Sequence, residues 1–112
     1  MFSLDKHRRY YLWRGRTDMR SGMDSLSGLV LDGMGRDPRT GDVFIFINKR
    51  GNHLKLLVWD TTGYVLYWKR LEAGAFEFPQ SDNPELSWAQ LVLILEGIDL
   101  KSVKQRKRLK KG

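Results

Sequence analysis

The stretch VFIFINKRGNHLKLLVWDTTGYVLYWKRL, residues 43–71, decides the fold. Two polar, glycine-containing segments divide it into three runs rich in β-branched, aromatic and leucine residues: Val43 to Ile47, Leu54 to Trp59 and Tyr64 to Leu71. Such runs, separated by short turns, indicate strands joined as hairpins. The connections are too short for parallel crossovers, so the sequence predicts an antiparallel meander. The unbroken apolar run of the first strand indicates that it is covered on both faces.

On the N-terminal side, the residues Tyr10 to Trp13 predict a short strand, and a helix follows it. Thr17 is the predicted N-cap of this helix, on which methionine, leucine and valine recur at spacings of three and four as far as Met34. Gly22 and Gly28 lie inside the predicted helix, where each costs about 1 kcal/mol relative to alanine. We expect them to be tolerated where another part of the backbone packs closely.

On the C-terminal side, Phe76 to Phe78 predicts a last short strand and Pro79 to Glu85 a loop. Ser87 followed by Gln90 is a capping-box pattern, and it opens a second helix with a broad apolar stripe. The expected fold class is therefore α+β: a small antiparallel meander with two helices that cover one of its faces.

The composition narrows the class of protein. A chain of 112 residues favours one domain, and the lack of cysteine excludes disulfides, thiol nucleophiles and cysteine-ligated metal sites. No apolar run reaches the ~18 residues of a membrane span. The first thirteen residues are too charged for a signal peptide, so we expect a cytoplasmic protein without membrane contact.

The charge is concentrated at one end of the chain. Residues 101–112 carry seven basic residues and no acid, whereas residues 1–100 hold thirteen of each kind. We therefore expect one domain over 1–100 and a disordered basic tail over 101–112, for which a polyanion is the usual partner. A tail that only aids solubility is the alternative. The basic residues of the tail are Lys101, Lys104, Arg106, Lys107, Arg108, Lys110 and Lys111.

Acidic residues give little support for an active site. None of them lies in a loop with the spacing of metal ligands, so we predict no metal, no cofactor and no catalytic residue. The glycines of Gly33-Met34-Gly35 lack the rest of a nucleotide-binding fingerprint. The acids considered were Asp18, Asp24, Asp32, Asp60, Glu72 and Glu96.

Basic residues interleaved with aromatic ones are the stronger signal in the body of the chain. Lys49 and Arg50 occupy the first predicted turn, and Lys55 and Lys69 approach the same end of the sheet if the next two strands pair. A basic rim beside exposed tyrosine or tryptophan suits phosphate contact and base stacking. The candidate nucleic-acid-binding residues of the body are Arg14, Arg16, Arg20, Lys49, Arg50, Lys55, Lys69 and Arg70.

A structural interpretation competes with this one. The same charges occur on ordinary sheet edges, where they prevent unwanted strand pairing, and here they are matched by an equal number of acids. We expect Trp59, Trp68 and Trp88 to be core residues rather than a stacking platform.

Several segments, taken in order, resemble one family over roughly residues 10–100. That family is the TnpB accessory protein of insertion sequence 66 type transposons. Phe78 stands where the family often has tryptophan before a proline. The matching segments are Thr17 to Leu26 (TDMRSGMDSL), Gly41 to Phe46 (GDVFIF), Lys55 to Gly63 (KLLVWDTTG), Lys69 to Phe76 (KRLEAGAF) with Pro79, and Leu91 to Asp99 (LVLILEGID).

The resemblance implies a small protein that is encoded beside a transposase and is needed for efficient transposition. Our first hypothesis is a non-catalytic accessory subunit that binds or bridges double-stranded DNA within the transposase complex. The alternative is an adaptor whose aromatic sheet face docks on the transposase or on another accessory protein. An enzyme is the third class. The sequence does not determine the oligomeric state or the DNA sequence preference.

Overall fold

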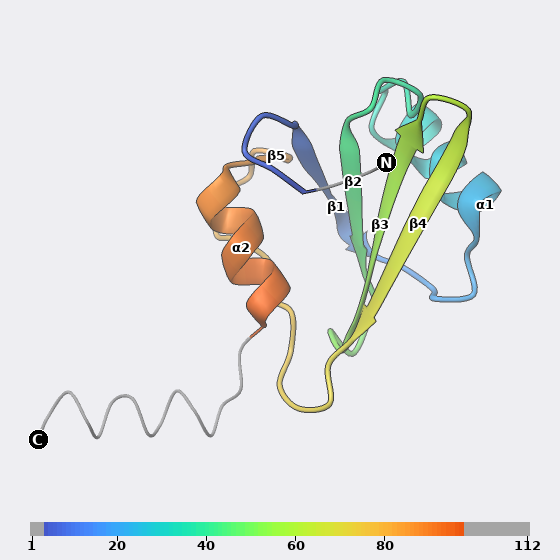
Figure 1. The fold of residues 1–112 in the computed structure, drawn as a ribbon. Helices are drawn as coiled ribbons and strands as arrows, with labels where there is room; N and C mark the ends of the chain where they lie inside the picture. Colours follow the sequence, from blue (N-terminus) through green and yellow to red (C-terminus); the bar gives the residue numbers. More distant parts are fainter. Residues whose placement is uncertain (1–3, 98–112) are drawn as a thin grey trace, which may run out of the picture.

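The computed structural model describes residues 4–97, which form a five-stranded sheet in the order β4-β3-β2-β1-β5 (Figure 1). The tail predicted over residues 101–112 lies outside the described residues. The strands are β1 (Tyr10–Arg16), β2 (Val43–Ile47), β3 (His53–Asp60), β4 (Gly63–Arg70) and β5 (Glu85–Leu86). The helical elements are α1 (Met23–Gly28), a π-helical turn η1 (Leu29–Gly33) that continues it, and α2 (Trp88–Glu96).

The strands β2, β3 and β4 form the predicted antiparallel meander, with Val43 opposite Val58 and Asp60 opposite Gly63. The strand β1 departs from this pattern, because it runs parallel to β2, with Tyr10 beside Val43. The connection between these two strands contains α1 and η1, and it is long enough for the crossover that a parallel pair requires. The α+β class is confirmed, and the sheet as a whole is mixed.

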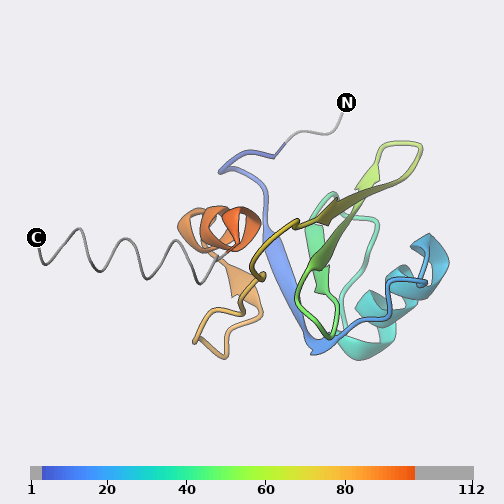
Figure 2. The ribbon, with the colours of Figure 1, turned by 90° about the horizontal axis from the view of Figure 1, so that it is seen from below.

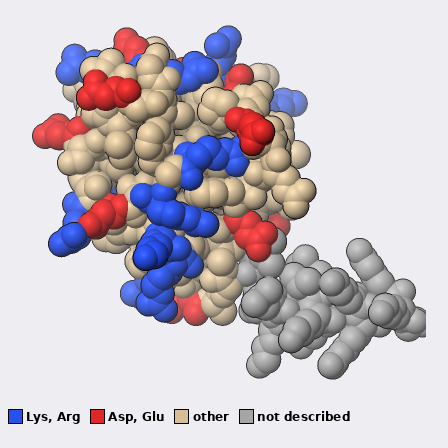
Figure 3. Space-filling view, turned by 180° about the vertical axis from the view of Figure 1, so that it is seen from behind, with Lys and Arg blue, Asp and Glu red and all other residues tan. Residues whose placement is uncertain are grey.

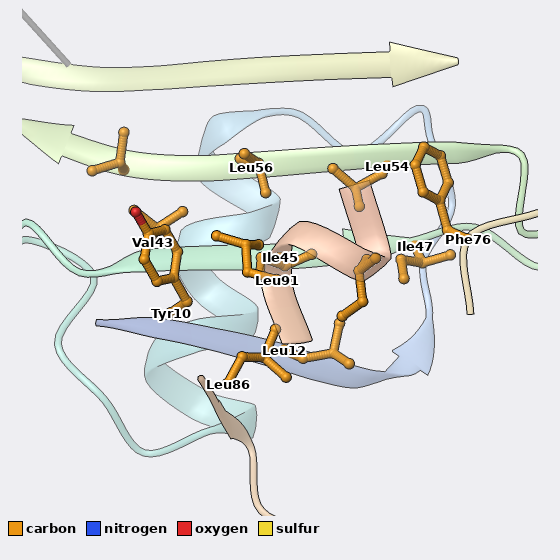
Figure 4. Close-up of a cluster of buried hydrophobic side chains, with 12 residues drawn as sticks. Tyr10, Leu12, Val43, Ile45, Ile47, Leu54, Leu56, Phe76, Leu86 and Leu91 are labelled. Atoms are coloured by element: carbon orange, nitrogen blue, oxygen red, sulfur yellow. The ribbon is translucent and has the colours of Figure 1, made fainter. Parts of the chain in front are cut away.

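The two helices lie on opposite faces of the sheet, as the view from below shows (Figure 2). On one face, Leu91 and Ile94 of α2 pack with Ile45 of β2, and Figure 4 shows that cluster. On the other face, Leu26 of α1 and Val30 of η1 pack with the sheet side chains that point to that face, such as Phe44 of β2. The expectation that both helices cover one face is therefore wrong. The whole of β2 is apolar, so each of its faces needs a covering layer.

The first helix begins later than predicted. Thr17 is not its N-cap: it is a buried residue directly after β1, and its N–H donates to the carbonyl of Ile47 at 2.9 Å. The cap position belongs to Gly22, which offers no side chain to the helix. Neither Gly22 nor Gly28 has an atom within 4 Å of the position where a Cβ would lie, so no close backbone approach explains them.

In the C-terminal part of the described chain, one prediction is wrong and one is confirmed. The segment Phe76 to Phe78 is not a strand; instead, the Phe76 ring is buried beside α2, and the short strand β5 pairs with β1 where a loop was predicted. The capping box is present, because the Ser87 Oγ accepts from the Gln90 N–H at 3.1 Å while the Gln90 side chain accepts from the Ser87 N–H at 2.9 Å. The helix ends at Gly97, which has a φ of 72° and lies against Leu71 and Ala75.

Trp13 explains two other glycines. Its indole lies between Gly15 and Gly33, so a Cβ on Gly15 would come within 2.8 Å of the indole Nε1 and a Cβ on Gly33 within 2.7 Å of the ring. No real Cβ makes contacts this short without a shift of the neighbouring group. The glycines therefore allow the indole to join the end of β1 to the end of η1.

We expect Gly28→Ala and Gly33→Ala to change stability in opposite directions. Gly28 has helical dihedral angles and open space around it, so alanine should stabilise the protein by about 0.5–1 kcal/mol. At Gly33 the new methyl group meets the Trp13 ring, which should cost about 1–3 kcal/mol. Urea unfolding of both variants measures this difference. Stabilisation by both substitutions would show that helix propensity outweighs the contact with Trp13.

Candidate nucleic-acid interface

Three of the predicted DNA-binding residues lie together at one end of the sheet. Arg16 ends β1, and Lys49 and Arg50 occupy the turn between β2 and β3. Figure 3 shows basic side chains gathered over the lower part of one face, which is the end at which Figure 1 places this turn. We refer to Arg16, Lys49 and Arg50 as the turn patch. The seven basic residues of the tail lie outside the described residues.

The turn patch borders two shallow hollows. One, of about 430 Å³, is also lined by Asp18, Asn48 and His53; the other, of about 320 Å³, is also lined by Phe76, Glu77 and Phe78. Both hollows are open to solvent, so they suit contact with an extended surface better than enclosure of a small molecule.

The cations of the turn patch differ in how firmly they are held. The Arg16 guanidinium donates to the Asn48 carbonyl at 3.2 Å and lies 4.3 Å from the centre of the Phe78 ring, so its direction is fixed. Lys49 and Arg50 are exposed, and within residues 4–97 their side chains form no hydrogen bond and no ion pair. Two adjustable cations beside a fixed one can follow the phosphates of a backbone.

Lys55, by contrast, has a structural position. Only 3% of its surface is exposed, and its Nζ donates to the carbonyls of Met19 at 2.7 Å and Ser21 at 2.8 Å. Burial lowers the pKa of the Lys55 ammonium, and the nearby Asp18 carboxylate opposes this effect to a smaller extent. The side chain thus holds the segment between β1 and α1 against the sheet, and it is not accessible to a phosphate.

Lys69 lies at the same end of the sheet as Lys55, as predicted, but on the opposite face. The register pairs Lys55 with Trp68 and Leu54 with Lys69, so the two lysines point to different sides. The Lys69 Nζ donates to the Leu95 carbonyl in the last turn of α2 at 2.6 Å. A cation at this position satisfies a free carbonyl and complements the helix dipole.

The remaining arginines also have partners. Arg14 donates to the backbone carbonyls of Pro79, Ser81 and Asn83, and it thereby holds the loop before β5. Arg70 approaches Glu72 at 3.2 Å in an exposed pair that contributes little to stability.

Arg20 forms a two-point ion pair with Asp18, whose shortest distance is 2.6 Å. Hydrogen bonds from the Arg20 side chain and backbone lower the pKa of the Asp18 carboxyl to about 2. Of the two acids that border the turn patch, Asp18 is therefore already paired with a cation of its own, and Glu77 lines the other hollow.

The tryptophans correct another prediction, because none of Trp59, Trp68 and Trp88 is fully buried. Trp68 is 58% exposed, and its Nε1 donates to the His53 Nδ1 at 2.8 Å. His53 was not among the predicted residues. The alternation of side chains along the strands could have identified both His53 and Trp68, since residues 53, 55 and 68 lie on one face of neighbouring strands.

No acidic constellation accompanies these cations. Within residues 4–97, no three His, Cys, Asp or Glu side chains come close enough together to hold a metal ion. The same part of the chain contains no helix that is long and apolar enough to span a membrane. Asp60 is the last residue of β3, directly before the turn into β4, in which Thr61 has a φ of 51°.

We expect Lys55→Met to destabilise the protein by about 1–3 kcal/mol, because two carbonyls lose their donor while the buried stem is conserved in size. The control is Lys49→Met, which removes the same charge from an exposed side chain and should stay within about 0.5 kcal/mol of the wild type. Chemical unfolding measures both. Equal effects would show that Lys55 is not a structural residue.

We expect the Asp18 carboxyl to titrate with a midpoint of about 2, and Arg20→Gln to move the midpoint up towards the ordinary value of 3.8. A lowered pKa in the folded state stabilises the protein above the unfolded-state pKa, and this contribution disappears as the pH falls through about 2. Carbon-13 NMR of the carboxyl group measures the midpoint. An unchanged midpoint in Arg20→Gln, with Lys49→Gln as the control, would contradict the pairing.

Comparison with known proteins gives the family. The family model described as IS66 Orf2 like protein (TnpB_IS66) matches residues 8–105. Two relatives come from Sinorhizobium fredii: the uncharacterized protein y4jC is 38% identical over 91 residues, covering 80% of this chain and 78% of its own, and the uncharacterized protein y4hO is 37% identical over 93 residues, covering 81% of each. No solved structure matches. The chain therefore belongs to the IS66 Orf2-like family, whose members have an accessory role associated with transposition.

Proposed function

We propose that the chain is a non-catalytic accessory subunit that binds the phosphate backbone of double-stranded DNA within the transposase complex. The observation that carries this proposal is the turn patch, in which three cations gather beside two acids, Asp18, which is already paired with Arg20, and Glu77, which forms no ion pair among residues 4–97. Cations that have no acidic partner are available to phosphate, and Arg16 is already oriented by its own contacts.

The rest of the charge suits a supporting role. Residues 1–100 are formally neutral, so three cations alone would hold DNA weakly. The seven basic residues of the tail would add sequence-independent contacts, and two weak contacts on one chain reinforce each other. On this proposal the sequence recognition and the chemistry belong to the transposase, while this subunit adds affinity or bridges DNA segments.

Salt-titrated binding of the full chain to a duplex of the transposon end tests the proposal. Each phosphate contact adds about −0.9 to the slope of log affinity against log salt, so Lys49→Gln/Arg50→Gln should flatten the slope by about 2. The matched control, Lys6→Gln/Arg39→Gln, removes the same charge from exposed residues that precede β1 and β2, at the other end of the sheet. A scrambled duplex measures any sequence preference.

Equal flattening by both double variants would mean that only net charge matters, and no flattening by the turn variant would contradict the role of the turn patch. Binding that depends on the tail alone would leave the patch without a function in DNA binding. Metal-dependent cutting or joining of the duplex by the purified protein would contradict the non-catalytic part of the proposal.

A second candidate function is an adaptor that docks on the transposase. A hollow of about 400 Å³ supports it, because its lining is mostly apolar and includes Leu4, Leu54, Leu56 and Leu95. It lies beside β4, which has no neighbouring strand on its outer side among the described residues. Loss of transposase binding in Tyr67→Ser, with an unchanged DNA salt slope, would favour the adaptor.

A further inference from the structure

Trp68 is the most exposed aromatic side chain of the described residues, at 58% of its surface. It lies on β4, the edge strand of the sheet, near the end of the hairpin that carries the turn patch. A single exposed apolar residue is ordinary on a protein surface. Trp68 differs because its neighbours hold the ring in one orientation.

Two contacts fix the indole. Its Nε1 donates to the His53 Nδ1 at 2.8 Å, and the Lys55 Nζ lies 4.2 Å from the centre of the ring. Lys55 is almost completely buried, so its ammonium lies against the inner face of the ring, and the outer face is directed to solvent. Rotation of the indole would break both contacts. The outer face is therefore a flat, preoriented aromatic surface.

His53 connects this surface to the turn patch. Its ring lies 5.6 Å from that of Trp68, and the same residue lines the hollow that Arg16, Lys49 and Arg50 share. In the β3–β4 register, His53 lies opposite Arg70, whose guanidinium pairs with Glu72. A flat aromatic surface and a group of phosphate-binding cations are thus joined by one side chain.

This combination matches the chemistry of unpaired nucleotides. A nucleobase in a duplex stacks on its neighbours and has no free face, whereas an unpaired base can stack on an aromatic side chain while cations bind its backbone. Stacking of this kind does not depend on the base sequence, because every base has a π-face. A preoriented ring also pays less conformational entropy on binding.

We propose that Trp68 and the turn patch together bind a single-stranded extension of DNA, with an unpaired base stacked on the outer face of the indole and the adjoining phosphates on the turn patch. The inference deepens the proposed function and rests on it, because it assigns the turn patch to a junction between duplex and single strand. Lys55 and His53 act as positioning residues that orient the ring.

The test compares a blunt duplex with the same duplex carrying a single-stranded extension of about six thymidines, a length within the usual range of single-strand sites. We expect the full chain to bind the extended duplex about five- to a hundred-fold more tightly than the blunt one. Trp68→Leu should remove the part of this preference that stacking supplies, so that only the contribution of the added phosphates remains, and it should leave blunt-duplex affinity unchanged. The matched control is Trp88→Leu, since Trp88 is also exposed, at 39%, but belongs to α2 on the other face.

A spectroscopic measurement keeps the test independent of folding defects in the variants. Stacking should quench tryptophan fluorescence when the wild-type chain binds the extended duplex. The quenching should persist in Trp88→Leu and be lost in Trp68→Phe, which retains an aromatic ring but removes the indole that reports the stack and its hydrogen bond to His53.

The two proposals fail in different ways. Equal wild-type affinity for both duplexes without quenching overturns the stacking site, while a flattened salt slope in Lys49→Gln/Arg50→Gln leaves the proposed function intact. A preference for the extension that depends on Trp68, with no effect of Lys49→Gln/Arg50→Gln, overturns the role of the turn patch. Loss of transposase binding in Trp68→Leu, with unchanged binding of both duplexes, overturns stacking in favour of a protein partner.

Discussion

The requirement to cover both faces of β2 determines the rest of the structure. All five residues of Val43–Ile47 are fully buried, and their side chains alternate between the two faces of a central strand. One layer cannot cover both faces, so α1 with η1 closes one side and α2 the other. The parallel placement of β1 has the same origin, since its connection to β2 carries the first helical layer across the sheet.

Burial of both faces also decides what the basic residues can do. A lysine or arginine that starts on a covered face must reach backbone carbonyls to avoid an unpaired buried charge, and Lys55 does so. Lys69 and Arg14 likewise hold α2 and the loop before β5 in place. A turn beyond the covering helices leaves its cations available to a ligand, and Lys49 and Arg50 occupy such a turn.

The local signals in the sequence predicted local structure well. Alternation and turn residues identified β2, β3 and β4, and the Ser87 and Gln90 pattern identified the start of α2. The misplaced start of the first helix has a tertiary cause: Thr17 bonds to Ile47, which is distant in the sequence. The candidate site shows the same difference between local and tertiary information. The sequence identified the basic residues, but only the register of β3 and β4 separates Lys55 from Lys69 and places Trp68 over Lys55.

The packing around Gly97 places the end of α2 close to the turn between β2 and β3. Gly97 lies against Ala75, and Ala75 in turn lies against Gly51, the residue that follows Arg50 in the turn. Gly97, the last residue that the structure describes, is therefore only two residue contacts away from the turn patch. On the proposal that residues 101–112 also bind DNA, the three residues of chain between Gly97 and Lys101 would keep the effective concentration of those charges high around DNA held at the turn. The two basic regions would then engage one stretch of DNA as a single bivalent ligand.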